Sequence, residues 1–408
     1  MSNLCDSPPF SVKTSNLKLN LHIREGVEAH RARENQVTTA RTERFWKTLN
    51  VVCVNSSAVG SLTMTFNELR KDYLLDRWVV IATERGRRPT DFGKQERLKA
   101  KISVCPLCPG NEHMTPPAVL VYLKSGKGIR KVKDKNGFRH KNWLIRCMPN
   151  LYPAFAPPKE KISRKKIMKC SDLVAAVGHH EVLVESPNHD EHPANARISQ
   201  LVHVINAYVD RLRELSAKPY VQYVSIFRNH GIEAGASLSH AHSQIIATPF
   251  IPKIVEDELK ASRKFWKQNE KCVFCDILEK ERKGPRLILE NSKFVVFAPY
   301  ASVHPLEFWI LPKEHKATLL DMSQNEVKTF AETLKTCLNG LNRLANDPPY
   351  NFGFHLTINK DAGEYYHWHL EVYPKLAIWA GFEKSTGMYI NTVTPEVAAE
   401  NLRKTISS

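Results

Sequence analysis

The sequence predicts an α+β protein made of two copies of one unit, with a mostly antiparallel sheet and flanking helices. Three observations lead to this prediction. Short β-rich runs alternate with amphipathic helical stretches, the connections between neighbouring runs are short, and one pattern of cysteines and histidines occurs twice. With 408 residues, of which 42% are hydrophobic, the chain has enough apolar material for two ordinary domains or two fused half-domains.

The predicted strands begin after Met64 and are rich in the β-branched and aromatic residues that favour strands. They are expected at 77–82 (RWVVIA), 180–186 (HEVLVES), 221–227 (VQYVSIF), 242–249 (HSQIIATP), 293–299 (KFVVFAP), 307–312 (EFWILP), 354–359 (FHLTIN) and 369–374 (HLEVYP). The stretch 198–217 has apolar residues at helical spacing and is expected to form a long helix. Short turns and single helices between the strands favour antiparallel pairing.

The repeat consists of a C-x-x-C pair, a histidine after a strand, and a second histidine 51 or 52 positions later. Its members are Cys105, Cys108, His189 and His240 in the first half, and Cys272, Cys275, His315 and His367 in the second. We therefore expect half-domains over 64–255 and 256–408. Residues 1–63 are polar and lack strand alternation, so they are expected to be a disordered extension, although a true start at Met64 explains them equally well.

The chain carries a formal charge of +17, which suits a polyanionic partner such as a nucleic acid or a phosphorylated metabolite. Much of the excess charge lies in tracts such as 124–135 and 159–166, which are typical of solvated loops, so nucleic-acid binding is the minor alternative. No run of eighteen apolar residues and no signal-peptide pattern is present. A cytoplasmic location without membrane insertion is therefore expected.

Each cysteine pair with its two histidines supplies the four ligands of a tetrahedral zinc site. Two such sets at nearly equal spacing form a much stronger signal than one C-x-x-C pair, and two zinc ions per chain are expected. His304 is an alternative ligand at the second site, whereas the neighbours of the first site, His179, His180 and His192, are interpreted as loop residues.

The segment FRNHGIEAGASLSHAHSQIIATP, residues 227–249, joins a small-residue loop to a strand that carries His240, His242 and Gln244 on one face. One imidazole of this strand can hold metal while its neighbour reaches substrate. A neutral histidine is abundant near pH 7 and suits reversible attack on phosphorus. Loop amides around Gly231, Gly235 and Ser237 can approach phosphates. The alternative is that His242 is an ordinary histidine beside a metal site.

These motifs resemble those of galactose-1-phosphate uridylyltransferases, a branch of the histidine-triad superfamily, over about residues 64–405 and most closely the archaeal and bacterial members. The resemblance implies two fused histidine-triad-like half-domains. From the segments DRWVVIATERGRRP, MPNLYPAF and FRNHGIEAGASLSHAHSQ it implies a role for each of a set of site residues. These are contacts to nucleotide or sugar phosphates at Arg85 and Arg88, a nucleotide contact at Asn150, phosphate contacts at Asn229 and Ser237, zinc binding by His240, the nucleophile at His242 and its partner at Gln244.

The segment AGFEKSTGMYINTVTPEVAAENL, residues 380–402, resembles the family's substrate-binding tail, which reaches across a homodimer into the neighbouring active site. That resemblance implies roles for Phe382, Glu383 and Asn391. Two positions depart from the family pattern, because Ala241 stands where many members have proline and Phe382 where a tyrosine is common. Both departures leave the sugar selectivity open.

The resemblance implies a double displacement in which UDP-glucose uridylylates His242 and a hexose 1-phosphate, expected to be galactose 1-phosphate, accepts the group. The same tail and H-x-H-S-Q strand also resemble plant-type ADP-glucose phosphorylases, which use an adenine nucleotide and inorganic phosphate. Uridylyl transfer is the favoured reading. A nucleotide hydrolase and a zinc-organised nucleic-acid-binding protein are further alternatives. Because the second half lacks a counterpart of the GIEAGASLS loop, His369 and Glu371 are expected to be structural.

Overall fold

A computed structural model describes residues 67–87, 105–126, 128–158 and 175–407. The predictions for residues 1–63 and for Arg88 fall outside these residues. Among the described residues, no helix is long and apolar enough to cross a membrane.

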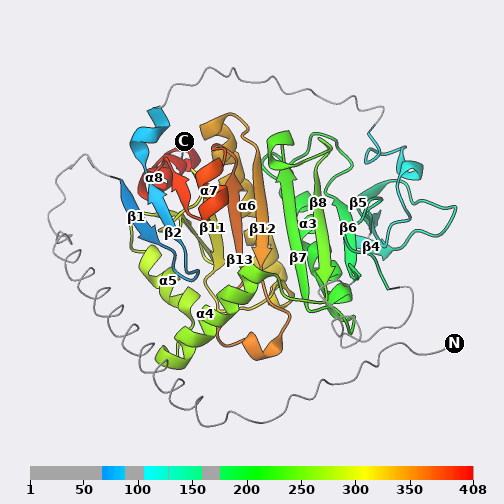
Figure 1. The fold of residues 1–408 in the computed structure, drawn as a ribbon. Coiled ribbons are helices and arrows are strands. Elements are labelled where there is room, and N and C mark those ends of the chain that lie inside the picture. The colour runs from blue at the N-terminus through cyan, green and yellow to red at the C-terminus, as the bar shows by residue number, and fades with distance from the viewer. Residues whose placement is uncertain (1–66, 88–104, 127, 159–174, 408) are drawn as a thin grey trace, which may run out of the picture. The chain divides into compact units, whose positions relative to one another are not determined.

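Eleven strands form one antiparallel sheet in the order β4-β3-β5-β6-β8-β7-β12-β13-β11-β10-β9 (Figure 1). Their bounds are β3 Leu120–Ser125, β4 Gly128–Val132, β5 Trp143–Pro149, β6 His179–Val184, β7 Tyr223–His230, β8 His242–Thr248, β9 Leu287–Glu290, β10 Phe294–Phe297, β11 Phe308–Pro312, β12 Tyr350–His355 and β13 His369–Pro374. The predicted α+β class with mostly antiparallel pairing is therefore confirmed.

A small second sheet joins the start of the described chain to its end. It contains β1 (Glu68–Lys71), β2 (Trp78–Ile81) and β14 (Tyr389–Asn391), with β14 parallel to β2. The helices are α3 Ile198–Ser216, α4 Lys253–Asn269, α5 Val273–Glu281, α6 Gln324–Ala345, α7 Gly381–Thr386 and α8 Pro395–Ser407. Short 3-10 turns lie at Thr83–Arg87, Glu112–Met114, Ile232–Ala234, Leu319–Asp321 and Lys360–Ala362.

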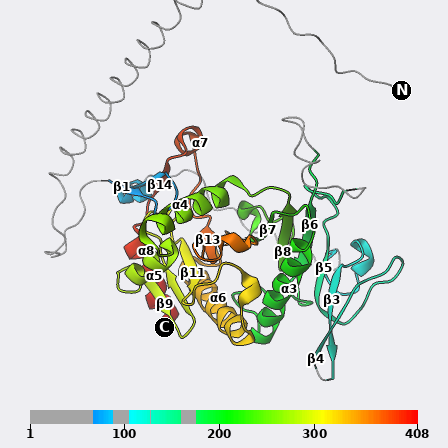
Figure 2. The ribbon, with the colours of Figure 1, turned by 90° about the horizontal axis from the view of Figure 1, so that it is seen from below.

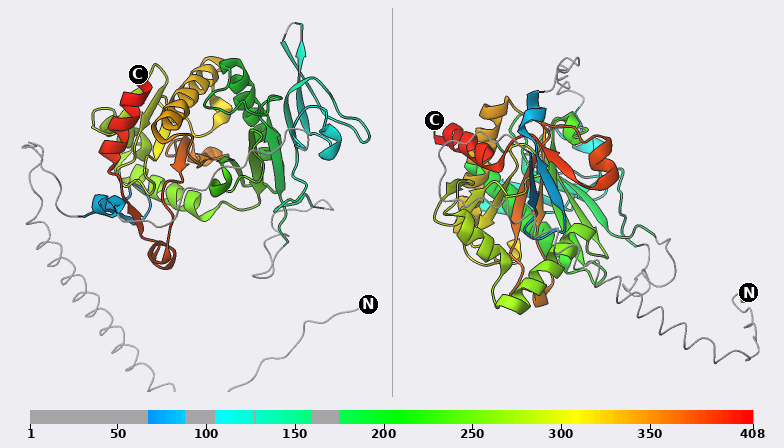
Figure 3. Two further views of the ribbon diagram at one scale, coloured as in Figure 1. Left: turned by 90° about the horizontal axis from the view of Figure 1, so that it is seen from above. Right: turned by 60° about the vertical axis from the view of Figure 1, so that its left-hand side comes forward.

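Alternation along the strands gives the large sheet two different faces. On one face, residues such as Ile226, Ile245 and Phe352 pack with α3 and α6 in the main core. Figures 2 and 3 show these two helices side by side on that face. On the opposite face, Trp309 and Leu311 pack with α4 and α5. In Figure 1 no described helix lies in front of the middle of β6, β8 and β7, whereas in the second half α4 and α5 pack on this face of the sheet.

The register of the sheet shows the duplication that the spacing predicted. Gln244 of β8 lies opposite Val182 of β6, and Glu371 of β13 lies opposite Trp309 of β11. The two halves meet where β7 pairs with β12, with Asn229 opposite Asn351. The proposed half-domain boundary at 255/256 stays a prediction.

Three local predictions need correction. The strand expected at 354–359 ends at His355, because the backbone of Thr357 turns to donate to Ala317. His179 and His180 are strand residues of β6, not loop residues, since their backbones continue the pairing with β8. β8 itself begins at His242, so His240 lies just before the strand.

Candidate active site and metal centres

His242 is the first residue of β8, and its ring is held in one orientation. Its Nδ1 lies 2.7 Å from the backbone oxygen of His240, which can only accept, so Nδ1 carries the proton. In the neutral imidazole the lone pair is then on Nε2. Burial lowers the pKa of His242, which keeps the ring neutral near pH 7. The arrangement gives a neutral histidine with one free, nucleophilic nitrogen.

A buried ion pair lies behind the His242 strand. The guanidinium of Arg228 lies 3.1 Å from Glu185, and both side chains are almost fully buried. Ser243, which points to this face, donates to Glu185 and contacts Tyr208 at 2.5 Å. This network fixes β7 to β8 from the side opposite His242. Removing one partner of such a pair leaves a buried charge and is strongly destabilising.

The small-residue loop between β7 and β8 turns sharply at Gly231. Its φ is 84°, and a Cβ there would lie 2.8 Å from Pro349, so only glycine fits. A 3-10 turn over Ile232–Ala234 follows. The loop is held from the second half, because the amide of Asn351 donates to the Asn229 side chain at 2.8 Å and to the Ala234 carbonyl at 2.7 Å.

Gln244 lies two residues beyond His242 on the same face of β8. Its Oε1 lies 2.7 Å from Nε2 of His180, which comes from the neighbouring β6. The predicted nucleotide contact Asn150 reaches the same ring, with its Nδ2 3.2 Å from Nε2 of His180. The structure thus brings Asn150 and Gln244 together around a histidine that sequence reasoning had assigned to a loop.

The first metal-ligand set converges as predicted. The ligand atoms of Cys105, Cys108, His189 and His240 lie within 4.8 Å of one another. Zinc bonded to sulfur at about 2.3 Å and nitrogen at about 2.05 Å in a tetrahedron separates the two ligand atoms by about 3.5 Å. The Cys108 sulfur lies 3.3 Å from Nδ1 of His189 and 3.4 Å from Nδ1 of His240. The residues present therefore fit a tetrahedral metal ion.

The other nitrogen of each histidine in this set also has a partner. Nε2 of His240 lies 2.8 Å from the Ser186 carbonyl, and Nε2 of His189 lies 2.9 Å from the Ser239 hydroxyl. A proton on Nε2 leaves Nδ1 free to bind metal, which is the usual arrangement of metal-binding histidines.

The second set, Cys272, Cys275, His315 and His367, converges in the same way. The Cys275 sulfur lies 3.4 Å from Nδ1 of His315 and 3.6 Å from Nδ1 of His367. Nε2 of His315 lies 2.7 Å from the Gly363 carbonyl. The alternative ligand His304 is not in this set, and its ring stacks on Trp379 instead, with the ring centroids 4.9 Å apart.

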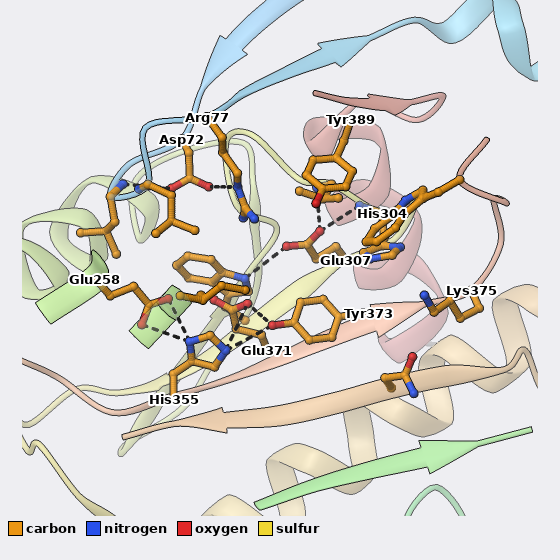
Figure 4. Close-up of a pocket in the computed structure, with 17 residues that line it drawn as sticks. Asp72, Arg77, Glu258, His304, Glu307, His355, Glu371, Tyr373, Lys375 and Tyr389 are labelled. Carbon is orange, nitrogen blue, oxygen red and sulfur yellow. Dashed lines mark hydrogen bonds and ion pairs between the residues drawn. The ribbon is translucent and has the colours of Figure 1, made fainter. Parts of the chain in front are cut away.

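A cavity of about 340 Å³ is lined mainly by residues of the second half, together with Asp72 and Arg77 from the turn between β1 and β2 (Figure 4). Its walls include Glu258, His355 and Glu371, which with His369 form a third group whose ligand atoms lie within 4.8 Å and could hold a cation. Burial lowers the pKa of His355, but Glu258 and Glu371 outweigh it and raise that pKa to about 9. Glu307 lies near Glu371 in the same cavity. Its burial and the negative charge of Glu371 raise the pKa of Glu307 to about 8.

The remaining predicted substrate contacts lie on segments other than β8. Arg85 is exposed on the 3-10 turn after β2, and on α7 Phe382 is exposed while Glu383 is half-buried. Ser237 is exposed in the loop before β8. Asn391 is buried, and its amide donates to the Ser302 and His304 carbonyls at 2.8 and 3.2 Å while accepting from Val393. Of the predicted contacts, Asn391 has the least freedom to reach a ligand.

Sequence reasoning missed several residues that the fold adds to these sites. They are His180, Glu185, Arg228, Asn351, Glu258 and His355. A signal existed for His180, since it alternates with Val182 and Val184 on a strand already predicted. Nothing in the local sequence marks Asn351, which lies 122 residues from Asn229 along the chain.

Comparison with known proteins identifies relatives of the whole chain. A family profile described as a domain of unknown function (DUF4921) matches residues 163–408. Over 83% of its length the chain is 33% identical to the ADP-glucose phosphorylase of Arabidopsis thaliana, covering 92% of that protein. It is 31% identical to the galactose-1-phosphate uridylyltransferase of Thermotoga maritima over the same share of its length, covering 98% of that protein.

Solved structures agree. The crystal structure of the Arabidopsis thaliana ADP-glucose phosphorylase with bound ADP-glucose matches with a TM-score of 0.69 at 30% identity, over 83% of this chain and 99% of that one. A uridylyltransferase structure matches with a TM-score of 0.61 at 26% identity, over 84% and 99% of the two chains. The fold and these relatives make the protein a nucleotidyltransferase. The chain belongs to the family of galactose-1-phosphate uridylyltransferases and ADP-glucose phosphorylases, as the motif resemblance predicted. Its place in an archaeal and bacterial branch stays a prediction.

Proposed function

We propose that this protein transfers a nucleotidyl group from a nucleotide sugar to a phosphate-bearing acceptor through a covalent intermediate on Nε2 of His242. The observation that carries the proposal is the 2.7 Å contact of Nδ1 with the His240 carbonyl, which leaves Nε2 as the nucleophilic atom.

The reaction consists of two displacements at one phosphorus. The Nε2 lone pair attacks the α-phosphorus, a P–N bond forms, and the P–O bond to the sugar phosphate breaks so that the sugar 1-phosphate leaves. Nδ1 keeps its proton throughout, and the His240 carbonyl stabilises the positive ring. An acceptor phosphate oxygen then attacks the same phosphorus and releases His242. The acceptor is already an oxyanion, so no general base is required.

Carboxamide groups of Gln244 and Asn229 and the backbone amides of the Gly231–Ser237 loop supply hydrogen bonds to the phosphoryl oxygens in this scheme. Asn150 contacts the nucleotide, and Arg85 and Arg88 contribute positive charge. The two Cys/His sets would hold a metal ion such as zinc, which would stabilise the segments that lead into β8 and β13. The chemical steps are assigned to His242 and to the groups that contact the phosphates.

Two substrate pairs fit this chemistry. Uridylyl transfer from UDP-glucose to a hexose 1-phosphate such as galactose 1-phosphate is the reaction that the motifs favour. Adenylyl transfer from ADP-glucose to inorganic phosphate is favoured by the greater likeness to the Arabidopsis enzyme, at 33% identity against 31% in sequence and a TM-score of 0.69 against 0.61 in structure. We place adenylyl transfer first on that ground.

The tail supports a homodimer in which α7 completes the neighbouring site. Ile378, just before the tail, is 95% exposed and Phe382 is 46% exposed, so both offer apolar surface that a partner chain could cover. Exchange of α7 between two chains would cover them and bring Phe382 and Glu383 to the partner's substrate.

Intact-protein mass spectrometry after mixing with ADP-glucose alone or UDP-glucose alone tests the proposal. We expect a mass gain of one nucleotidyl group from one of the two sugars, and no gain in His242→Ala. The matched control is His369→Gln, which alters the corresponding residue of the second half and should keep the adduct. The base is identified by the size of the adduct. If neither nucleotide sugar labels the native chain, covalent transfer at His242 is wrong.

A further inference from the structure

Gln244 lies two residues beyond His242 on β8, and Asn229 lies two residues beyond Phe227, the β7 residue that pairs with Gln244. Their carboxamides are useful to a phosphoryl group in only one orientation. A carboxamide accepts at its oxygen and donates at its nitrogen, whereas a phosphoryl oxygen carries negative charge and only accepts. An amide turned the wrong way therefore presents a lone pair to the phosphate. Something must select the orientation of Gln244 and of Asn229 if both are to donate.

For Gln244 the selecting group is the ring of His180. The backbone N–H of Ala154 donates to Nδ1 of His180 at 3.1 Å, so Nδ1 is unprotonated and the proton of the neutral ring is on Nε2. That Nε2–H points to Oε1 of Gln244, 2.7 Å away. The longer 3.2 Å contact of the same Nε2 with the NH₂ group of Asn150 joins two donors and is therefore not a hydrogen bond in this protonation state. The amide oxygen of Gln244 is thus occupied, and its NH₂ group is the part left for a ligand.

For Asn229 the selecting group is Asn351, its direct cross-strand neighbour. The Asn351 amide donates one hydrogen to Oδ1 of Asn229 at 2.8 Å and the other to the Ala234 carbonyl at 2.7 Å. The Ala234 carbonyl can only accept a hydrogen bond, so the side-chain group of Asn351 that faces it must be the NH₂ group. This fixes the orientation of the Asn351 amide. The Asn229 oxygen is occupied in the same way as that of Gln244.

We propose that His180 and Asn351 are positioning residues that hold Gln244 and Asn229 with their NH₂ groups toward the transferring phosphoryl group. This proposal rests on the proposed function of His242. The two residues come from opposite neighbours of the β8–β7 pair, His180 from β6 in the first half and Asn351 from β12 in the second. The second half therefore contributes to the geometry of the reaction through Asn351, although its own equivalent of His242, His369, is fully buried.

The test compares donors with non-donors at the same positions. Asn351→Asp is nearly isosteric but can only accept, so it turns the Asn229 amide round and presents its oxygen to the phosphate. We expect the single-turnover rate of adduct formation to fall about 100-fold, the size of effect seen when one preorganised donor is lost. Asn351→Ala should cost less. His180→Ala should lower the rate, and His180→Gln, whose NH₂ can still donate, should restore most of it.

His179→Ala is the matched control, because this neighbouring histidine faces the other side of β6 and contacts Tyr220 at 2.7 Å. It should leave the rate unchanged. Urea unfolding of every variant separates loss of fold from loss of orientation. The losses should appear in the rate at saturating nucleotide sugar more than in the apparent affinity for the sugar nucleotide.

The proposal is overturned if folded Asn351→Asp and His180→Ala react within twofold of the native chain, or if His180→Gln is as slow as His180→Ala. If the native chain itself forms no adduct, the proposed function fails instead. Calorimetric binding of ADP and UDP then tests the orientation alone, since it needs phosphate contacts without chemistry. The proposal is supported if the affinities of the variants for these nucleotides follow the order expected above for the rates. Equal affinities would contradict it.

Discussion

The two halves carry the same strand pair at equivalent positions but differ at the residues that surround the central histidine. In both, Nδ1 of that histidine lies close to the backbone oxygen two residues earlier, at 2.7 Å for His242 and 3.2 Å for His369. The neighbours differ completely. The first half has His180, Val182 and Gln244, and the second has Glu307, Trp309 and Glu371 at the corresponding places.

These substitutions close the second site in two ways. Nε2 of His369 lies 3.2 Å from Glu371, so the nitrogen that is free in His242 has a carboxylate partner. The Trp309 ring stacks on His369 with the centroids 5.0 Å apart, and His369 has no exposed surface. Under the proposed function, the orientation of the imidazole alone does not make a nucleophile. Two features distinguish the sites. Nε2 is accessible in His242 but not in His369, and the first half has the amide of Gln244 where the second half has the carboxylate of Glu371.

The largest expected difference between the halves concerns their metal ligands. Cys108→Ser should remove one equivalent of metal and lower the rate of adduct formation at least about 10-fold, because His240 precedes His242 on the same segment. Cys275→Ser should remove one equivalent with little change in that rate. Metal analysis and single-turnover kinetics on both variants check this. Equal kinetic losses would show that the second site supports the catalytic strand as directly as the first.

A smaller effect is expected from opening the second half. Trp309→Val gives the second half the residue that the first half has at this place, Val182. The substitution should lower the unfolding free energy by about 2–4 kcal/mol, because it leaves a cavity. We expect nucleotide labelling to remain at His242 alone, because Glu371 still occupies Nε2 of His369. Peptide mapping of the labelled variant shows the site. Labelling at His369 would mean that the Trp309 ring alone prevents His369 from reacting in the native chain.

The last expected effect concerns pH. Burial and the charge of Glu371 raise the pKa of Glu307 to about 8, whereas an ordinary glutamate has 4.5. The folded chain therefore holds this proton more tightly than the unfolded chain, and the stability that it provides is lost as the pH rises from 4.5 toward 8. The unfolding free energy of Glu307→Gln should change less over this range than that of the native chain. If the unfolding free energies of the native chain and of Glu307→Gln change with pH in parallel, the group that titrates is not Glu307.

Periodicity and spacing were enough to predict the fold class, because strands such as β6, β8 and β13 are marked by their own residues. The two Cys/His sets could be predicted because a duplicated pattern restricts which histidines pair with which cysteines. His180 and Asn351 could not be assigned a role in this way. Their significance depends on which strands are neighbours, and the pairing of β7 with β12 joins segments whose local sequences contain no trace of it.

The pairing of β7 with β12 also has a consequence for how the protein folds. Asn351 reaches Asn229 across 122 residues of chain, so this contact closes a long loop and is among the slow steps of a β-rich protein. Local helices and hairpins form earlier and produce most of the far-ultraviolet circular dichroism. During refolding, the recovery of nucleotidyl transfer should therefore lag behind the recovery of secondary structure, since the active site is complete only when the last distant strands have joined.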